Sequence, residues 1–401
     1  MGHENSVPHV REVALSESSY SRLHFRVLKI REFDIAIVGG GLVGAAIAWG
    51  VASARPRIAM LDEGDVALRA ARGNFALVWV QGKGLGLPQY GLWTLRAAET
   101  WTAFADMLLV QTGIDVQYRR PGGFQLALSQ DELARRVAHL EAIGAQPGMP
   151  RLDHEVLDPA ALKRVLPDIG PEVVGGTFSR LDGHCNSLRL LRALHAGFRL
   201  QGGTYLPGHR AEAITHRAGE FRIATPLGEI RCGSVVLAGG LDNARLAPMV
   251  GLRMPVRPVR GQILVTQRTE RFLDYPVATI RQTAEGSVLV GDSQEEAGLD
   301  TRATHDVLAA MADRAHRTFP RLARVNVVRS WAALRVMPPD GFAIYEASAA
   351  CPGAFAAATH SGVTLASNHA LALAPHIARG ALPADAFAAF GTGRFDVAQA
   401  A

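Results

Sequence analysis

The chain has 401 residues, of which 48% are hydrophobic and 20% charged, so we expect a globular protein with two domains or one large one. Its formal net charge of +5 comes from scattered basic residues, which argues against a nucleic-acid-binding face, and no apolar stretch is long enough to predict a transmembrane helix. Three widely spaced cysteines without a CxxC pair (Cys185, Cys232 and Cys351) predict neither a disulfide framework nor a metal site, and they fit a protein of the reducing cytoplasm.

Residues 1–32 are predicted to form an N-terminal extension. They carry acidic residues early and lack the apolar core of a secretory signal. We expect this segment to be loosely ordered, and a misplaced start codon is the alternative explanation for it.

The first folded unit is predicted between residues 33 and 62. The short apolar run 33–38 is typical of a strand that is buried on both faces of a parallel sheet. A glycine-rich turn and an alanine-rich helix over 45–54 follow. A second strand is predicted over 57–61 and is closed by Asp62. This order of strand, helix and strand indicates a βαβ unit.

Gly39, Gly41 and Gly44 form a GxGxxG motif in the context that dinucleotide binding requires, after a strand and at the start of a helix. Gly39 permits the tight turn, Gly41 lets the backbone approach a pyrophosphate, and Gly44 lets the helix pack closely on the strand. The N–H groups and dipole of the helix N-terminus favour phosphate, and Asp62 can accept hydrogen bonds from ribose hydroxyls. A glycine-rich turn in another α/β fold is the alternative.

The rest of the chain alternates helical and strand-like segments. Apolar residues at helical spacing predict helices over 90–109, 131–143, 158–166, 187–200, 304–319 and 367–380. Strands are predicted in 116–128, 211–237, the turn-rich stretch 253–292, 329–335, 342–345 and 354–358. Parallel pieces at both ends of the chain therefore flank antiparallel ones, which predicts an α/β fold (α+β overall) with a Rossmann-type nucleotide domain and an inserted antiparallel-sheet domain.

The glycine motif alone does not distinguish NAD from FAD. Residues 70–74 (Ala-Ala-Arg-Gly-Asn) lie about ten residues past Asp62 and favour FAD, because a flavin needs the chain to return to the pyrophosphate and ring after the second strand. Taken alone, this stretch fits a solvated loop equally well. With FAD as the cofactor, we predict an FAD-binding domain of residues 33–115, 182–252 and 329–395 and a substrate domain of residues 116–181 and 253–328.

Five stretches carry a resemblance that runs from about Phe33 to Phe390. They are GGGLVG with Asp62, RGN at 72–74, VVLAGG at 235–240, PVRPVRGQ at 255–262, and the pair WAALRVMPPDG (331–341) and THSGVTLA (359–366). In this order and spacing they resemble the D-amino-acid-oxidase-like family of flavoproteins. That family includes glycine oxidase, monomeric sarcosine oxidase and the flavin subunits of opine, hydroxyproline and hydrogen-cyanide-forming dehydrogenases.

The resemblance implies which residues hold FAD, bound without a covalent link. The ADP half would contact Gly39, Gly41, Leu42, Val43, Gly44, Asp62 and Glu63, with Ala211 near the adenine and Gly239 and Gly240 along the cofactor. Arg72, Gly73 and Asn74 would lie near the pyrophosphate and the flavin ring. The loop of His360, Ser361, Gly362, Val363 and Thr364 would bring amides to the pyrimidine edge of the flavin, where they stabilise negative charge on the reduced ring.

Arg335 matches the arginine that pairs with the substrate carboxylate in glycine oxidase-like members. A guanidinium suits this role because its planar fork binds a carboxylate bidentately and keeps its charge when buried. Arg335 follows an apolar strand, and α/β sites lie at the carboxyl ends of strands. A surface ion pair is the alternative role for this residue.

The chain also departs from the family pattern. Sarcosine oxidase-like members attach the flavin to a cysteine where this chain has about Ala333, so we expect no covalent attachment there. A carboxylate-binding tyrosine of several relatives corresponds to Thr279, with Arg281 close by, and an arginine of the flavin loop corresponds to His360. The carboxylate clamp is therefore incomplete unless Arg281 substitutes, or the substrate differs. His184 and His360 are candidate polar groups of the pocket, with a structural histidine as the alternative.

The resemblance implies FAD-dependent oxidation of the C–N bond of a small amino or imino acid, by hydride transfer to flavin N5. Arg335, His360 and Arg281 are the predicted catalytic residues, and no metal is expected. The electron acceptor is O₂, a partner subunit or a quinone, and the chain would form a hetero- or homo-oligomer. The alternatives are a flavin subunit of a multi-subunit dehydrogenase, a 2-hydroxy-acid dehydrogenase with a histidine base, and a flavin-free binding protein. The scarcity of lysine, with only Lys83 able to reach the flavin region, favours a dehydrogenase.

Overall fold

A computed structural model describes residues 30–54, 57–64 and 69–396 of the chain. The predicted N-terminal extension lies outside the described residues except for 30–32, which open strand β1 (Ile30–Val38). The predicted loose ordering of that extension is therefore not addressed by the structure.

The main sheet has eight strands and is parallel at its centre. Strands β16 (Ile344–Ala347), β17 (Ala354–Ala358), β11 (Gly228–Leu237), β1, β2 (Ile58–Leu61) and β8 (Thr204–Leu206) lie side by side in that order. Every pair of neighbours in this row is parallel except β16 and β17, which are antiparallel. Strands β9 (Ala213–Arg217) and β10 (Glu220–Thr225) extend β11 as an antiparallel hairpin. This arrangement confirms the predicted Rossmann-type sheet.

Both faces of the main sheet are buried, because successive residues of its strands enter different cores. Ile35 and Ile37 of β1 pack into a core shared with helices α1 (Leu42–Ala52), α2 (Pro88–Thr112) and α5 (Ser187–Leu200). Ala36 and Val38 enter the core on the opposite face. Helix α1 has no charged side chain, as expected for a helix that is covered on nearly all sides.

The C-terminal helix predicted over 367–380 is present but is not uniform. It consists of α8 (Ala366–Asn368), the π-helical turn η4 (His369–Leu373) and α9 (Ala374–Ala378), and it packs against α1 and α2. Among the helices of the described residues, none combines the length and the apolar composition that crossing a bilayer would need.

A second, antiparallel sheet lies beside the first. Its strands follow the order β13 (Ile280–Gln282), β14 (Ser287–Val290), β12 (Arg257–Arg268) and β15 (Val327–Met337), and helix α7 (His305–Thr318) packs on it. Strand β15 pairs with β12 from Val327 to Met337. Residues 329–337, which we assigned to the FAD-binding domain, are thus hydrogen-bonded into the antiparallel sheet, and the domain boundaries stay a prediction.

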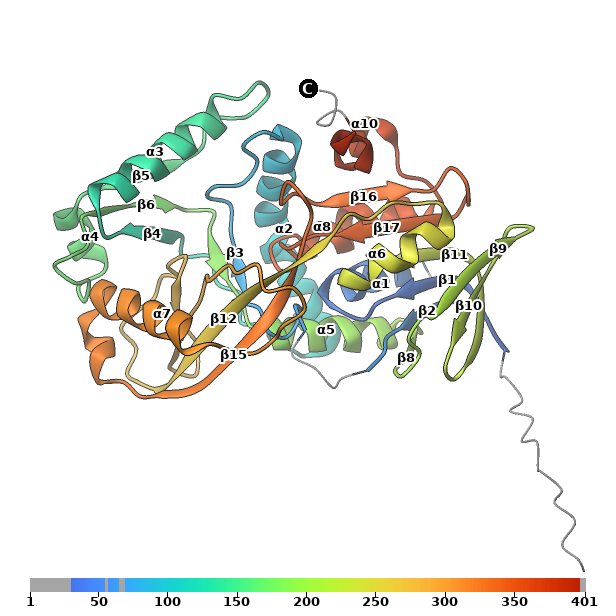
Figure 1. Cartoon of the computed structure of the whole chain (residues 1–401), viewed down its shortest axis with the longest axis horizontal. Coiled ribbons are helices and arrows are strands. Elements are labelled where there is room, and N and C mark those ends of the chain that lie inside the picture. Colours follow the sequence, from blue (N-terminus) through green and yellow to red (C-terminus); the bar gives the residue numbers. More distant parts are fainter. Residues whose placement is uncertain (1–29, 55–56, 65–68, 397–401) are drawn as a thin grey trace, which may run out of the picture.

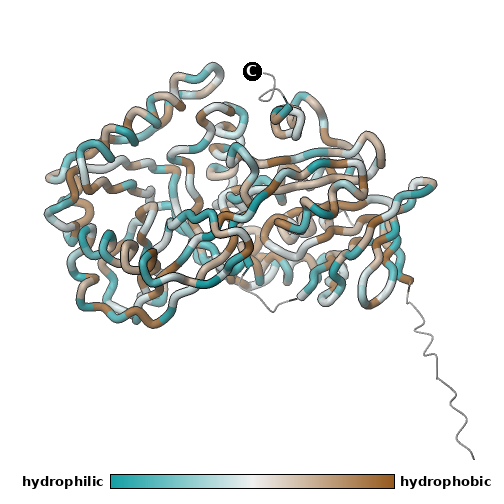
Figure 2. Tube along the Cα trace, in the orientation of Figure 1, coloured by the Kyte–Doolittle hydropathy of each residue, from teal (hydrophilic) through white to brown (hydrophobic). Residues whose placement is uncertain are grey.

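A three-stranded sheet completes the fold. Strands β4 (Gly123–Ala127), β6 (Gly175–Ser179) and β5 (His154–Leu157) are flanked by α3 (Gln130–Gly144) and α4 (Pro159–Val165). The periodicity of the sequence did not predict β5 and β6. In Figure 1 these elements lie at the end of the molecule opposite the β9–β10 hairpin, with β12 and β15 crossing the middle. Helix α3 buries only Leu140 and Ile143, and Figure 2 colours much of it hydrophilic.

Candidate active site

The segments predicted to bind the cofactor meet at one edge of the main sheet. Strands β17, β11, β1 and β2 are neighbours and parallel, so their carboxyl ends lie side by side. Gly39–Gly41 follow β1, Asp62 follows β2, Gly239 and Gly240 follow β11, and residues 360–364 follow β17. Ligands of open α/β sheets bind at this edge.

The turn between β1 and α1 has the shape that a pyrophosphate needs. Gly39 has φ +110°, and a Cβ atom on Gly44 would lie 1.9 Å from the carbonyl oxygen of Gly39, so only glycine allows this approach of helix and strand. A Cβ on Gly41 would meet only Ala71, at 3.6 Å. Helix α1 begins at Leu42 with no acidic residue in its first turn and no side-chain cap, so its N–H groups remain available to an anion.

Asp62 and Glu63 border this turn. The carboxylate of Asp62 accepts hydrogen bonds from the backbone N–H of Gly40 (2.7 Å) and Gly64 (2.9 Å), which leaves lone pairs for ribose hydroxyls. Glu63 forms ion pairs with Arg69 and, at 3.3 Å, with Arg210. Asp62 therefore connects the ends of β1 and β2 in the protein itself.

Ala211 and the glycines after β11 lie along the same edge. Ala211 is buried, and its carbonyl oxygen accepts a hydrogen bond from Arg245 at 2.7 Å. Gly240 has φ +65°, and a Cβ there would lie 3.3 Å from Val336 of β15. The edge of the main sheet is thereby in contact with the antiparallel sheet.

The turn of Arg72, Gly73 and Asn74 packs on strand β15. Nε1 of Trp331 donates to the carbonyl oxygen of Gly73 at 3.1 Å, and a Cβ on Gly73 would lie 2.4 Å from Cβ of Ala333. Asn74 donates to the carbonyl of Ala71 at 2.9 Å, while its Oδ1 is buried without a partner among the described residues. A buried acceptor without a donor is unusual for a protein alone and fits a site for a ligand.

The loop after β17 packs against the first turn of α1. A Cβ on Gly362 would lie 3.5 Å from Cγ2 of Val43. The loop is fixed from the other side by Trp101, whose Nε1 donates to the carbonyl oxygens of Val363 (3.2 Å) and Thr364 (3.0 Å). The residues present therefore fit an FAD that extends from the α1 N-terminus to this loop.

Lys83 joins this loop from a distant part of the sequence. Its Nζ lies 3.2 Å from Nε2 of His360 and donates to Oγ of Ser361, also at 3.2 Å. Tyr90 donates to the same Oγ at 2.9 Å. Burial lowers the pKa of Lys83 to about 8, and burial together with the charges of Lys83 and Arg335 keeps the pKa of His360 well below its usual value. His360 is therefore neutral at physiological pH.

Asp182 holds the segment that carries Lys83. It is buried and accepts hydrogen bonds from the backbone N–H of Val80 (2.5 Å) and from Nε2 of Gln81 (2.7 Å). Burial raises its pKa to about 7, against the effect of these hydrogen bonds. Because its hydrogen bonds are to residues 80 and 81, Asp182 fixes the position of the segment that leads into Lys83.

Arg335 lies on β15 and faces the loop after β14. Its Nη1 donates to the carbonyl oxygen of Ser293 at 2.7 Å, and its Nη2 lies 4.0 Å from the carboxylate of Asp292. Asp292 has φ +83°, an uncommon conformation for a residue other than glycine. Burial raises the pKa of Asp292, and the nearby positive charges of Arg335 and Lys83 act in the opposite direction and lower it. We therefore refer to the charged side chains of Arg335, Lys83 and Asp292, together with the neutral His360, as the charged cluster.

Arg281 lies apart from this cluster. Its Nε donates to the carbonyl oxygen of Phe75 at 2.6 Å, and its guanidinium lies over the Phe75 ring. Burial lowers the pKa of Arg281 to about 10. His184 lies within the influence of this charge, and burial together with Arg281 lowers its pKa to about 3. Arg281 of β13 thus contacts Phe75, which directly follows the turn 72–74, and His184 pairs with Leu77 two residues further along the chain.

The structure brings most of the predicted residues together, and their roles stay predictions. The residues that sequence reasoning missed are Asp182, Asp292 and Tyr90, and Lys83 was named only as a lysine within reach of the flavin. Asp292 follows the apolar strand Ser287–Val290 and Gly291, which is the one sequence signal that could have found it. No group of three or more His, Cys, Asp or Glu side chains in the described residues could hold a metal ion.

Comparison with known proteins adds to this geometry. The model of a family described as "FAD dependent oxidoreductase" matches residues 34–377. The chain is 47% identical to one of the subunits of opine oxidase from Agrobacterium tumefaciens (strain Ach5), over 92% of this chain and 99% of that protein. It is 42% identical to the opine oxidase protein of the same name from Rhizobium meliloti, over 92% of this chain and 99% of that protein.

Among solved structures, the fold is similar to that of glycine oxidase from Geobacillus kaustophilus. The TM-score is 0.77 at 23% sequence identity, covering 88% of this chain and 96% of that one. At this identity the likeness concerns the fold, and it confirms the predicted architecture.

Proposed function

Because the chain belongs to the FAD-dependent oxidoreductase family, we propose that it oxidises the C–N bond of a small amino or imino acid to an imine, which water then hydrolyses. The observation that carries this proposal is the charged cluster of Arg335, Lys83, His360 and Asp292 beside the predicted cofactor edge. A small anionic substrate suits a site with two fixed cations, and the opine oxidase relatives support an amine of this kind.

FAD would be held by the α1 N-terminus, by Asp62 and by the loop 360–364, and it would supply the acceptor for the hydride that leaves the substrate carbon. We propose that it is bound without a covalent link. Ala333, which cannot form a thioether, lies against the turn 72–74, and Cys185 and Cys232 are buried in hydrophobic cores.

Arg335 would bind the substrate carboxylate. Its Nη1 is fixed by Ser293, so the remaining N–H groups have a defined direction, and a guanidinium pairs with a carboxylate at two points. The charges of Arg335 and Lys83 oppose the entry of an ammonium group. The substrate amine would therefore react in its neutral form, with no dedicated base.

A second candidate function is that of a flavin subunit that passes electrons to a partner. The two opine oxidase relatives favour it, because their names describe them as subunits and hence as parts of larger assemblies. In that case the acceptor would be a partner protein or a quinone rather than O₂. A location in the reducing cytoplasm stays a prediction from the three unpaired cysteines.

The test is anaerobic reduction of the purified full-length protein, reconstituted with FAD, by glycine, sarcosine, D- and L-proline, opines and 2-hydroxy acids. We expect the flavin absorbance near about 450 nm to bleach with an amino or imino acid. Fast recovery in air would identify an oxidase, and slow recovery a subunit that needs a partner. Bleaching by hydroxy acids alone would contradict C–N oxidation.

A further inference from the structure

Asp292 and Arg335 present complementary free groups to each other. Oδ1 of Asp292 lies 4.0 Å from Nη2 of Arg335, which is too long for a direct hydrogen bond. Both hydrogen bonds of Arg335 use Nη1, and the carboxylate of Asp292 makes none with any other residue that the structure describes. Unused donors and unused acceptors therefore lie side by side, and both side chains are partly open to solvent.

The backbone of Asp292 is held in a conformation that a side chain disfavours. Its φ is +83°, in the left-handed region where glycine is the usual residue. On one side, the N–H of Gly291 donates to the carbonyl oxygen of Thr279 at 2.9 Å. On the other side, Oγ of Ser293 accepts from the backbone N–H of Gln262 at 2.7 Å. The fixed neighbours impose this conformation, and strain of this kind is concentrated at functional sites.

The loop that carries Asp292 contacts the predicted cofactor side of the fold. A Cβ atom on Gly291 would lie 2.7 Å from Cδ2 of Phe75, and Phe75 directly follows the turn 72–74. Ala333 of β15 packs on the same turn, and Arg335 lies two residues further along this strand. Both members of the pair are thus within one or two residues of a packing contact with this part of the chain.

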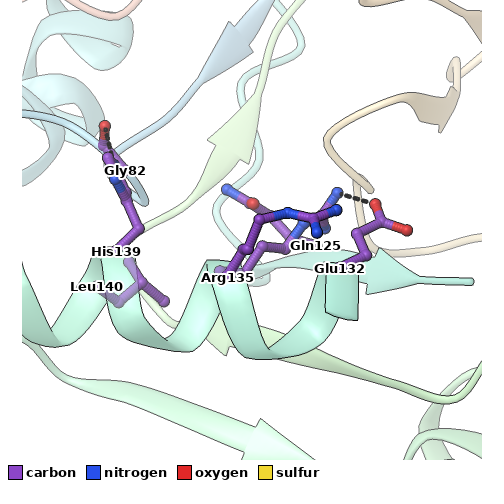
Figure 3. A pocket seen from close by; sticks show the side chains of 7 residues that line it. Gly82, Gln125, Glu132, Arg135, His139 and Leu140 are labelled. Atoms are coloured by element: carbon purple, nitrogen blue, oxygen red, sulfur yellow. Dashed lines mark hydrogen bonds and ion pairs between the residues drawn. The ribbon is translucent and has the colours of Figure 1, made fainter. Parts of the chain in front are cut away.

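A role as a structural counter-ion does not account for Asp292. Glu132 of α3, which lines the pocket in Figure 3, shows such a role, because it accepts from Arg136 at 2.7 Å and from Arg314 at 2.6 Å. Asp292 is half-exposed and has no contact of this kind, and exposed pairs contribute little to stability. Glycine would suit the backbone conformation better, which leaves the carboxylate itself to be explained.

We propose that Asp292 binds the nitrogen of the substrate and accepts a hydrogen bond from its N–H, while Arg335 binds the carboxylate. In an α-amino acid one carbon separates these two groups, which matches the short distance between the free groups of the pair. This inference rests on the proposed C–N oxidation and adds a residue that contacts the reacting nitrogen.

The carboxylate of Asp292 also acts on the chemical step. As hydride leaves the substrate carbon for its acceptor, the lone pair of the nitrogen becomes the second C–N bond, and the nitrogen gains a positive charge. A hydrogen-bonded carboxylate stabilises this charge more than it stabilises the neutral amine, so it lowers the barrier to hydride transfer. The N–H proton stays on the nitrogen in this step, and Asp292 is therefore not a base.

The first experiment measures binding without turnover. 2-Aminoisobutyrate has no hydrogen on the carbon that bears the nitrogen and cannot lose hydride, and pivalate has the same shape with a methyl group in place of the amine. Calorimetric titration of the full-length, FAD-loaded protein gives the ratio of the two affinities. Asp292→Asn should lower this ratio about 10- to 100-fold, with pivalate bound as tightly as before or more tightly. Asparagine tolerates a positive φ, so the backbone is kept.

Asp106→Asn is the matched control. Asp106 is exposed on α2 and makes no hydrogen bond or ion pair with another described residue, so its substitution removes the same charge from another part of the surface. The affinity ratio should stay at the wild-type value. An unchanged ratio in Asp292→Asn, or an equal loss of affinity for both ligands, would overturn Asp292 as the residue that binds the amine.

Stability gives a readout that does not depend on a ligand. Asp292→Gly removes the carboxylate and introduces the residue that this φ favours. The urea concentration at the midpoint of unfolding should equal that of the wild type or exceed it, although the affinity ratio falls as in Asp292→Asn. A lower midpoint would identify the carboxylate as a structural counter-ion of Arg335 and overturn the proposal.

Turnover separates this inference from the proposed function. With the amino or imino acid that bleaches the flavin fastest, the rate constant of anaerobic flavin reduction at saturation should fall about 10- to 100-fold in Asp292→Asn. Bleaching with an unchanged rate constant and affinity ratio in this variant would remove Asp292 but keep C–N oxidation. Absence of bleaching by any amino or imino acid, with an Asp292-dependent affinity ratio, would remove C–N oxidation but keep the amine site.

Discussion

Gly261 of β12 lies directly beneath the guanidinium of Arg335. A Cβ atom on Gly261 would be 2.2 Å from Nη1 of Arg335, although the residue paired with Gly261 across the two strands is Ala333. The absence of a side chain at position 261 thus leaves the space in which the arginine lies. This accounts for the glycine within the stretch PVRPVRGQ.

Gly261→Ala should therefore displace Arg335 while keeping the fold. The clashing atoms are the far end of a flexible side chain, so the arginine can move at little cost in stability. We expect kcat/KM to fall about 100-fold, because a displacement of the order of 1 Å is enough for such a loss. Steady-state kinetics and flavin content measure the two effects. Gly233→Ala in strand β11, where the new Cβ would be 3.4 Å from its nearest neighbour, should change neither.

Arg335→Ala should lower kcat/KM for amino and imino acids by about 100-fold or more, because in the proposed site the partly buried charge partner of the substrate carboxylate is lost. Flavin content should stay at the wild-type level, since the contacts of Arg335 are to Ser293 and Asp292. Arg324→Ala is the control, because Arg324 is exposed just before the same strand and makes no hydrogen bond or ion pair among the described residues. An unchanged kcat/KM for Arg335→Ala would exclude the proposed carboxylate pairing.

Gly44→Ala should weaken both folding and FAD binding. The added Cβ would lie 1.9 Å from the carbonyl oxygen of Gly39. Because the positions of the Cβ and of this oxygen are both set by the backbone, neither can rotate away, and α1 must move away from β1. Overpacking of this kind costs about 1–3 kcal/mol of unfolding free energy. Chemical denaturation and the ratio of flavin to protein absorbance test this. Gly144→Ala at the end of α3, where a Cβ meets nothing within 4 Å, should be neutral or slightly stabilising.

The partly buried Lys83 should make stability depend on pH in the alkaline range. Its pKa is about 8 in the folded protein against 10.5 as the ordinary value, so between these values the unfolded chain binds more protons. The free energy of unfolding contributed by Lys83 then rises as pH increases from about 8 to 10.5. Between these two pH values, the free energy of unfolding of the wild type should rise by about 1–3 kcal/mol relative to that of Lys83→Met. Urea denaturation at several pH values measures it, and parallel curves for the two proteins would contradict the lowered pKa.

The local patterns of the sequence were sufficient for the Rossmann-type sheet. The run 33–38, the glycines that follow and Asp62 each have a local physical cause, and the structure places them as expected. Strands β5 and β6 escaped prediction because they are short and lack the alternation that marks a half-buried strand. Their pairing to β4 depends on contacts that local periodicity does not report.

The candidate site was only partly predictable for a related reason. Arg335 could be placed because it lies on an apolar strand with a recognisable motif. The contact of Lys83 with His360 joins residues 277 positions apart, and nothing local in the stretch Gln81–Gly84 indicates it. Asp292 likewise enters the cluster through a loop whose course is set by Arg335 and by the network of Arg260 with Glu295.

Strand β15 has a consequence for how such a protein can change in evolution. Ala333 and Arg335 point to the same face, two residues apart. Ala333 is packed against the turn 72–74, while Arg335 donates to the carbonyl oxygen of Ser293 in the loop after β14. Insertion or deletion of a single residue here would exchange the two faces of the strand and separate both side chains from their partners. The spacing between the turn 72–74 and Arg335 is thus inherited as a unit, because one strand fixes both ends of it.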